Sequence, residues 1–154
     1  MAKQHYSTDE LSYHVIGICM EVHREIGPGF PEEYYQRALE FEFAQRNLLF
    51  ESQKPVQMLY KNVQVGMSYL DFDIKEEVIL EIKSVNQLTK THLFQVLKYL
   101  AVARRPMALL VNFGNPSLEY KRIFPTKKIQ EHWSKQENHS VIHPSNSNNP
   151  FHPL

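Results

Sequence analysis

The sequence predicts an α/β domain in which a central mixed β-sheet is flanked by helices. Two observations lead to this fold class. Apolar residues recur at helical spacing in the first third of the chain, and strand-like alternation with short apolar runs follows, interrupted by one further helical segment. That order is typical of a sheet with helices packed on it. The 154 residues, 42% of them hydrophobic, provide a core for one such domain.

The N-terminal part predicts two helices. Polar residues before position 10 are suitable N-caps, and apolar side chains then recur at helical spacing as far as Ile26. Gly27-Pro28-Gly29 ends this helix, and a second is predicted from about Pro31 to about Arg46. Cys19, the single cysteine, lies in the apolar stripe of the first helix, where we expect a buried, unreactive thiol.

The middle of the chain changes to strand patterns. Residues 50–60, 62–74 and 78–85 predict three strands, with Lys75-Glu76-Glu77 as the turn between the second and the third. Pro55 in the first of them is typical of an edge strand, because proline has no amide to donate to a neighbouring strand.

A helix and two more strands follow. Helical spacing returns over residues 89–104, and the apolar run 107–113 is typical of a buried central strand. Because a helix connects strand 78–85 to strand 107–113, we expect these two strands to be parallel, with a right-handed crossover. A last strand over 120–124 and a closing helix over 126–135 complete the pattern.

We expect the domain to span residues 1–135 and a polar tail to follow. Residues 136–154 are rich in Asn, Ser, Pro and His, so disorder is predicted there. No run of about 18 apolar residues and no secretory signal is present, so we expect a soluble cytoplasmic protein that does not bind membranes. The 17 basic and 17 acidic residues cancel, so any nucleic-acid-binding surface has to be local.

The second and third predicted strands form a hairpin with a charged face. If its turn centres on Glu76, antiparallel pairing sets Asp71 opposite Glu81, with Cβ atoms about 5 Å apart. Alternation then places four charged residues on one face: Asp71, Asp73, Glu81 and Lys83. The apolar residues of the second strand share the other face: Leu70, Phe72 and Ile74.

This charged face suits a metal-assisted reaction on phosphate. Two carboxylates opposite each other repel, and a divalent cation between them removes the conflict. Mg²⁺ binds carboxylate, carbonyl and phosphate oxygens, so Asp71, Glu81 and the Ile82 carbonyl are candidate ligands. Lys83 is placed to stabilise phosphate charge or help activate water. The same spacing also fits an ordinary hairpin with a solvated charged face, and this alternative stays open.

Two further segments carry polar residues suited to such a site. His92, Gln95 and Tyr99 are three and four residues apart, so they share one face of the predicted helix 89–104. Glu32 lies at the start of the second helix, where a carboxylate also interacts favourably with the helix dipole. Alternatively, the three residues of helix 89–104 form an ordinary polar helix face, and Glu32 only interacts with the helix dipole.

Three motifs follow one another within residues 10–125: Gly29-x-x-Glu32-x-x-Tyr35, Asp71…Glu81-x-Lys83 and Gln95-x-x-x-Tyr99. Together they resemble the GxxExxY proteins, small bacterial proteins of the PD-(D/E)XK nuclease superfamily. The resemblance implies a restriction-endonuclease-like α/β core with the acidic motif on adjacent strands. It also implies a metal-dependent nuclease that uses Mg²⁺ or Mn²⁺.

The resemblance also implies roles for individual residues. It makes five of them catalytic: Asp71, Glu81, Lys83, Gln95 and Glu32. Glu32 is an additional metal ligand in this interpretation, and three residues contact substrate: Tyr35, His92 and Tyr99. The expected partner is nucleic acid, with DNA favoured over RNA. A catalytically silent nucleic-acid-binding or protein-interaction module on the same fold is the alternative, and a homodimer stays open.

Overall fold

The computed structural model describes the backbone of residues 5–142 and the side chains of residues 5–138. Its elements follow the predicted order: α1 (Thr8–Ile26), α2 (Glu32–Gln45), β1 (Phe50–Tyr60), β2 (Val63–Ile74), β3 (Val78–Lys83), α3 (Lys90–Ala103), β4 (Met107–Asn112), β5 (Glu119–Ile123) and α4 (Lys127–Ile142). The prediction of a mixed sheet flanked by helices is confirmed.

The strands form one sheet in the order β1-β2-β3-β4-β5. β3 and β4 are parallel and are connected through α3, as predicted, while the other neighbouring pairs are antiparallel. β1 is an edge strand, so the missing amide hydrogen of Pro55 does not interrupt the hydrogen bonding in the centre of the sheet. All residues of β4 are buried, which explains its continuous apolar sequence.

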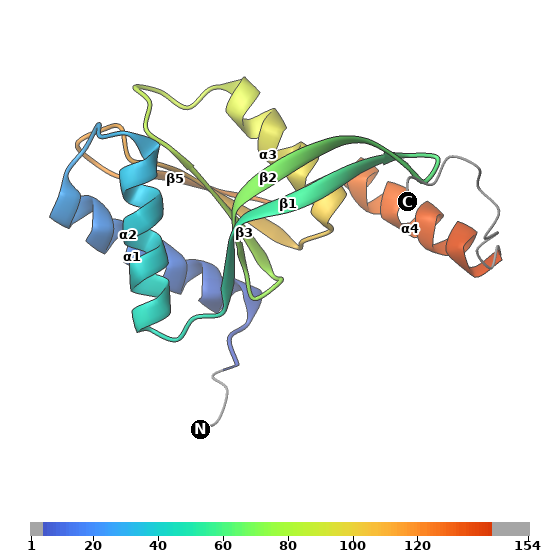
Figure 1. Ribbon diagram of the computed structural model, residues 1–154, viewed down its shortest axis with the longest axis horizontal. Coiled ribbons are helices and arrows are strands. Elements are labelled where there is room, and N and C mark those ends of the chain that lie inside the picture. The colour runs from blue at the N-terminus through green and yellow to red at the C-terminus, as the bar shows by residue number, and fades with distance from the viewer. Residues whose placement is uncertain (1–4, 143–154) are drawn as a thin grey trace.

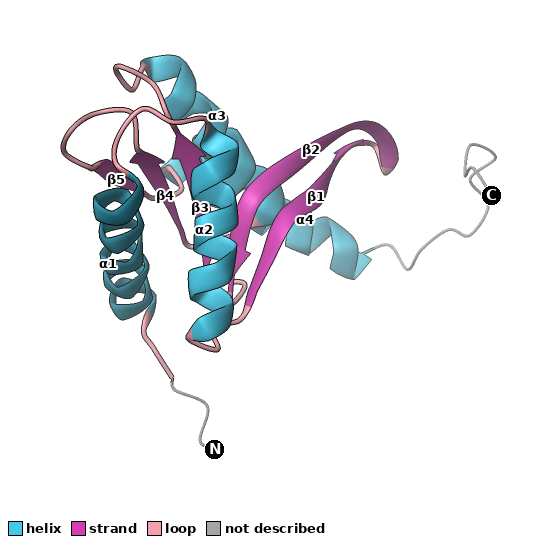
Figure 2. Cartoon of the chain, turned by 60° about the vertical axis from the view of Figure 1, so that its left-hand side comes forward, coloured by secondary structure: helices cyan, strands magenta, loops and turns pink. Residues whose placement is uncertain are grey.

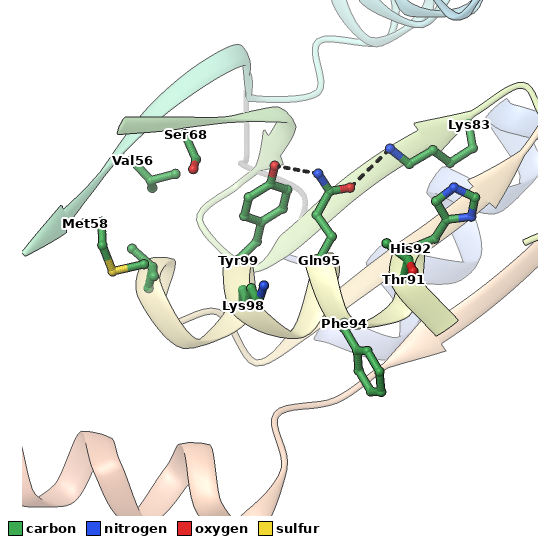
Figure 3. Close-up of a pocket in the computed structure, with 11 residues that line it drawn as sticks. Val56, Met58, Ser68, Lys83, Thr91, His92, Phe94, Gln95, Lys98 and Tyr99 are labelled. Atoms are coloured by element: carbon green, nitrogen blue, oxygen red, sulfur yellow. Dashed lines mark hydrogen bonds between the residues drawn. The ribbon is translucent and has the colours of Figure 1, made fainter. Parts of the chain in front are cut away.

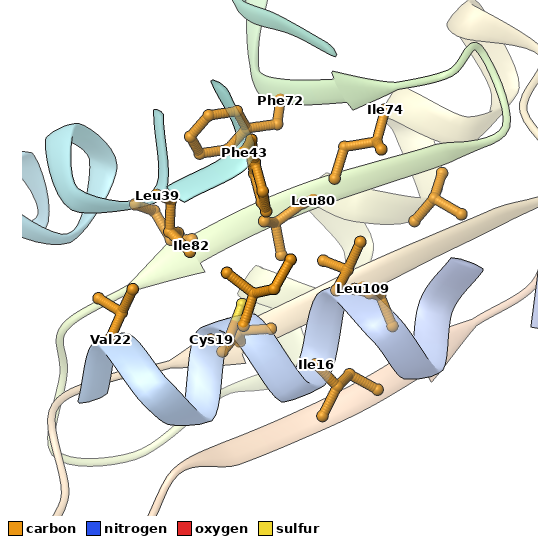
Figure 4. Close-up of a cluster of buried hydrophobic side chains, with 14 of the residues drawn as sticks. Ile16, Cys19, Val22, Leu39, Phe43, Phe72, Ile74, Leu80, Ile82 and Leu109 are labelled. Atoms are coloured by element: carbon orange, nitrogen blue, oxygen red, sulfur yellow. The ribbon is translucent and has the colours of Figure 1, made fainter. Parts of the chain in front are cut away.

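Helices cover both faces of the sheet (Figure 1; Figure 2). α1 and α2 pack on one face, where Leu39 and Phe43 meet Phe72 and Leu80 (Figure 4). Cys19 is fully buried in the same cluster, and burial raises the pKa of its thiol to about 12, so the expected inert thiol is present.

α3 covers the opposite face of the sheet. Its Val96 and Leu100 pack with Ile79 of β3 in a second cluster. α4 lies against α3, where the Trp133 indole N–H donates to the Ala101 carbonyl at 2.8 Å. Within the described part of the chain, no helix is long and apolar enough to cross a membrane.

The outer parts of β1 and β2 leave the sheet as a two-stranded arm, residues 55–69 (Figure 1; Figure 2). The side chains of β2 exchange faces at its base. Phe72 packs with the α1–α2 cluster and Leu70 with the α3 cluster, so the expectation that they share a face is wrong. Gln53, at the same level of β1 as Asp71, has a left-handed φ of 49°.

α4 extends beyond the predicted end near Lys135, as far as Ile142. Arg104 at the end of α3 supports the extension, because its guanidinium bonds to Gln136 and lies 3.6 Å from the Glu137 carboxylate. α4 therefore includes residues 136–142, the first part of the predicted polar tail. Residues 143–154 lie outside the described residues.

Candidate active site

Asp71 and Glu81 lie together where β2 separates from β3. Three pairs confirm the predicted register: Phe72 with Leu80, Asp73 with Ile79 and Ile74 with Val78. Beyond these three pairs, side chains take the place of the backbone hydrogen bonds between the two strands. The Asp71 amide donates to Glu81 Oε1 at 3.1 Å, and the Ile82 amide donates to Asp71 Oδ2 at 2.9 Å. Each carboxylate thus binds the backbone of the other strand, which holds both acids at the divergence.

The two carboxylates of this pair repel each other. Glu81 is only 3% exposed. Burial raises the pKa of Glu81 well above its usual value and the charge of Asp71 raises it further, while the hydrogen bond from the Asp71 amide and the Lys83 charge act to lower it. Among the described residues, neither carboxylate forms a salt bridge. A cation between them would relieve the repulsion.

The backbone of Ile82 adds a third oxygen. In a strand, the amide and carbonyl of one residue point to the same side, and successive residues alternate. The Lys83 carbonyl accepts from the Phe113 amide at 2.7 Å, on the β4 side. The Ile82 carbonyl therefore points to the side of Asp71, which its amide already contacts. Two carboxylates and one carbonyl are hard oxygen donors, which fit Mg²⁺ or Mn²⁺.

A hydrogen-bonded row of side chains connects β3 to α3 (Figure 3). Lys83 Nζ donates to Gln95 Oε1 at 3.2 Å, and Gln95 Nε2 donates to the Tyr99 hydroxyl oxygen at 3.1 Å. Burial raises the pKa of Tyr99, and the negative charges of Glu81 and Asp71 raise it further. The hydroxyl is therefore protonated at neutral pH, and its proton is not used in the bond to Gln95.

His92 combines a structural role with a place in the lining of the same pocket as Lys83 (Figure 3). Its Nδ1 accepts from the Thr89 amide at 3.0 Å, and its own amide donates to Thr89 Oγ1 at 3.5 Å, so the two residues form a capping box at the start of α3. Because Nδ1 accepts a hydrogen bond, the proton of the neutral imidazole is on Nε2. That N–H is the group His92 can offer to a substrate.

Tyr35 is part of the core. Its ring is fully buried and stacks on Phe113 with centroids 4.3 Å apart. Its hydroxyl donates to the Gly27 carbonyl at 2.6 Å and accepts from the Phe30 amide at 3.1 Å. These bonds hold the loop in which Gly27 and Gly29 have φ values of 87° and 79°. The structure therefore places Tyr35 away from any surface that a substrate can reach.

Glu32 is exposed in the first turn of α2. Among the described residues, no group of three or more His, Cys, Asp or Glu side chains is arranged to hold a metal ion. The predicted convergence of Glu32 with Asp71 and Glu81 is therefore absent from this structure. A role for Glu32 as an additional ligand stays a prediction.

Asp73, the other acid of the hairpin, belongs to a separate ion-pair network. It is 2% exposed, and Arg105 contacts both of its oxygens, at 3.0 and 2.8 Å. Lys54 Nζ lies 2.8 Å from Oδ2. Burial acts to raise the pKa of Asp73, but the hydrogen bonds from Arg105 and Lys54 outweigh it and hold the pKa below its usual value. Asp71 is thus the acid available to a metal.

Gln36 supports the site from α2 and was not anticipated from the sequence. Its Nε2 donates to the Asp71 carbonyl at 3.2 Å, to Glu40 at 3.1 Å and to Ser52 at 3.2 Å. These acceptors determine the orientation of the amide. Gln36 Oε1 is buried without a hydrogen-bond partner among the described atoms. The available signal was a polar residue on the buried face of α2, one turn after Glu32.

Comparison with known proteins decides the family. A model described as the PD-(D/E)XK nuclease superfamily matches residues 9–123. The chain belongs to the PD-(D/E)XK nuclease superfamily. The match includes Asp71, Glu81 and Lys83, so the superfamily part of the predicted resemblance is confirmed. The narrower GxxExxY grouping stays a prediction.

Comparison with solved structures concerns the fold alone. The crystal structure of SSO0001 matches with a TM-score of 0.50 and 13% identity, covering 90% of this chain and 72% of that one. An alkaline exonuclease, LHK-Exo from Laribacter hongkongensis, has a TM-score of 0.45 and 13% identity, covering 92% and 81%. With the family match and the observed mixed sheet flanked by helices, the expected restriction-endonuclease-like core is confirmed. No curated protein matches the chain.

Proposed function

We propose that this member of the PD-(D/E)XK superfamily is a divalent-metal-dependent nuclease that hydrolyses phosphodiester bonds. The observation that carries the proposal is the Asp71–Glu81 pair, which is held at the divergence of two strands and forms no salt bridge among the described residues. Burying a carboxylate without a salt-bridge partner destabilises a fold, so the presence of this pair calls for a functional reason.

Asp71, Glu81 and the Ile82 carbonyl would hold Mg²⁺ or Mn²⁺. A bound ion would polarise the scissile phosphate and lower the pKa of the attacking water. The backbone amides that bind the two carboxylates restrict their rotation, so their oxygens are oriented before an ion arrives. This preorganisation is the contribution of the strands themselves.

The hydrogen-bonded row of Lys83, Gln95 and Tyr99, beside the carboxylate pair, would supply the groups that contact the phosphate. The Lys83 ammonium stabilises the negative charge that develops on the phosphate oxygens during attack. Gln95 is a positioning residue, because it accepts a hydrogen bond from the Lys83 ammonium and donates one to the Tyr99 hydroxyl. The protonated Tyr99 hydroxyl donates to a phosphate oxygen.

Cleavage of labelled DNA and RNA oligonucleotides tests the proposal. The wild-type protein is expected to cut with Mg²⁺ or Mn²⁺ and to stop when EDTA is added. Lys83→Ala should lower the rate by about 10²-fold or more, the usual effect of removing one group that stabilises a transition state. Lys121→Ala, at an exposed position of β5, is the matched control and should cut at the wild-type rate.

Two results would count against a nuclease. One is the absence of cleavage by the wild-type protein with either metal on any of the substrates. The other is equal cleavage by the wild type and Lys83→Ala, which would assign the activity to a contaminant or to another site. Retained nucleic-acid binding in the first case would support the silent binding module on the same fold.

A further inference from the structure

A groove of about 620 Å³ lies between the arm and α3, and it begins at the candidate active site. Lys83, Gln95 and Tyr99 are among the residues that line it (Figure 3). The arm contributes Val56 and Met58 to the opposite wall. A ligand in this groove would therefore extend from the arm to the residues placed at the phosphate.

The lining of the groove is positively charged. The described residues that line it include two lysines, Lys83 and Lys98, and no Asp or Glu. The chain as a whole has 17 basic and 17 acidic residues, so this is a local departure from neutrality. A groove with cationic side chains complements a chain of phosphates.

The rest of the lining is largely apolar. Phe94 is 55% exposed and projects from α3, and Met58 on the arm is 44% exposed. A duplex stacks its base faces internally and presents phosphates, sugars and base edges to a protein. A single strand offers its base faces, which stack on aromatic side chains. The exposed Phe94 and Met58 side chains thus complement unstacked bases, and not the surface of a duplex.

We propose that this groove binds single-stranded nucleic acid and leads it to the carboxylate pair, an inference that rests on the proposed nuclease function. Phosphates contact Lys98 and Lys83, and bases contact Phe94 and Met58. The substrate class is then a single strand or a single-stranded end of a duplex.

Binding without cleavage tests the inference. Fluorescence anisotropy in EDTA compares one short labelled oligonucleotide, as DNA and as RNA, alone and annealed to its complement. The single strand should bind more tightly than the duplex. Phe94→Ala should weaken single-strand binding by about 5- to 150-fold, the range for loss of one stacked base, and leave duplex binding unchanged. Phe124→Ala is the matched control, because Phe124 is 54% exposed and does not line the groove.

Salt dependence provides a second readout that a loss of folding does not reproduce. The slope of log K against log salt should decrease by about 0.7 for Lys98→Ala if this lysine neutralises one phosphate of a single strand. Lys121→Ala should leave the slope unchanged. An unchanged slope for Lys98→Ala would contradict the placement of a phosphate there.

The groove inference and the nuclease proposal fail in different ways. Equal or tighter binding of the duplex, or equal effects of Phe94→Ala and Phe124→Ala, overturns the groove inference while metal-dependent cleavage can persist. Preferred single-strand binding with the expected loss in Phe94→Ala supports the groove inference even when no metal supports cleavage. DNA and RNA affinities separate the two polynucleotides within the same inference.

Discussion

The main-chain amide of Asp71 donates a hydrogen bond to the Glu81 carboxylate at 3.1 Å. The Glu81 side chain therefore takes the place of the next backbone hydrogen bond between β2 and β3. The register that aligns the two acids also ends the ladder at their level, so β2 departs into the arm and both carboxylates stay at the divergence. The candidate site is a consequence of how the sheet opens.

Glu81→Gln should stabilise the metal-free protein at neutral pH. The pKa of Glu81 is raised above its usual value of 4.5. Between that value and the raised one, the folded state binds more protons than the unfolded state, so the free energy of unfolding falls as pH rises through this window. Urea unfolding at pH 7.5 should show a gain of about 1–3 kcal/mol for Glu81→Gln, which disappears toward pH 4.5.

Glu25→Gln, at an exposed position of α1, is the control for this gain and should stay within about 0.5 kcal/mol of the wild type. Added Mn²⁺ should stabilise the wild type and not Glu81→Gln, because only the wild type keeps both carboxylates. A loss of stability in metal-free Glu81→Gln would show that the ionised carboxylate is not the strained group.

Gln95→Ala should lower kcat with little change in KM. Without the amide, the Lys83 ammonium loses its acceptor and the Tyr99 hydroxyl loses its donor. Misplacement of a charge-stabilising group by about 1 Å costs on the order of 10²-fold in rate. Steady-state cleavage measurements check this split, and a rise in KM with unchanged kcat would instead assign Gln95 to substrate binding.

Tyr35→Phe should lower the free energy of unfolding by about 1–3 kcal/mol, because the Gly27 carbonyl and Phe30 amide lose their partner. Urea denaturation of Tyr34→Phe provides the matched comparison, since Tyr34 is 53% exposed. If Tyr35→Phe instead weakened nucleic-acid binding without changing stability, the structural role assigned to Tyr35 would be incorrect.

Arg105→Ala should destabilise the protein in a pH-dependent way. The pKa of Asp73 is held below its usual value of 3.8, so this acid stabilises the fold above that pH, and the effect is lost as pH falls through the lowered pKa. Removing one partner of a buried pair costs up to about 3–5 kcal/mol, and the remaining Lys54 reduces that cost.

Unfolding curves at pH 7 and near pH 3 check the Arg105→Ala expectation, because the difference from the wild type should shrink at the lower pH. Arg37→Ala removes an exposed pair with Glu33 and should cost about 0–1 kcal/mol at most. Equal effects of the two variants would mean that Asp73 does not depend on Arg105.

The register of the hairpin could be predicted because its turn and its alternation are both local. Lys75 and Glu76 adopt positive φ values at the turn, and the alternating pattern sets the pairing on either side. The exchange of faces near Asp71 could not be predicted in the same way. It coincides with a left-handed conformation at Gln53, and glutamine is not a residue type that marks such a position.

The roles of Tyr35 and Gln36 also could not be predicted from the sequence. A tyrosine suits a buried hydrogen bond and a substrate contact equally well, and only the stacking on Phe113 separates the two. Gln36 of α2 donates to the Asp71 carbonyl of β2, a contact between residues 35 positions apart in the chain. Spacing along one helix or strand carries no information about such contacts.

The central claim is that Asp71 and Glu81 hold one divalent ion, and anomalous diffraction from crystals soaked in Mn²⁺ tests it most directly. We expect one anomalous peak with oxygens of both carboxylates at about 2.1 Å. Crystals of Asp71→Asn soaked in the same way should show a weaker peak or none. A wild-type crystal without a peak at this pair, or with manganese bound only elsewhere on the chain, would contradict the account.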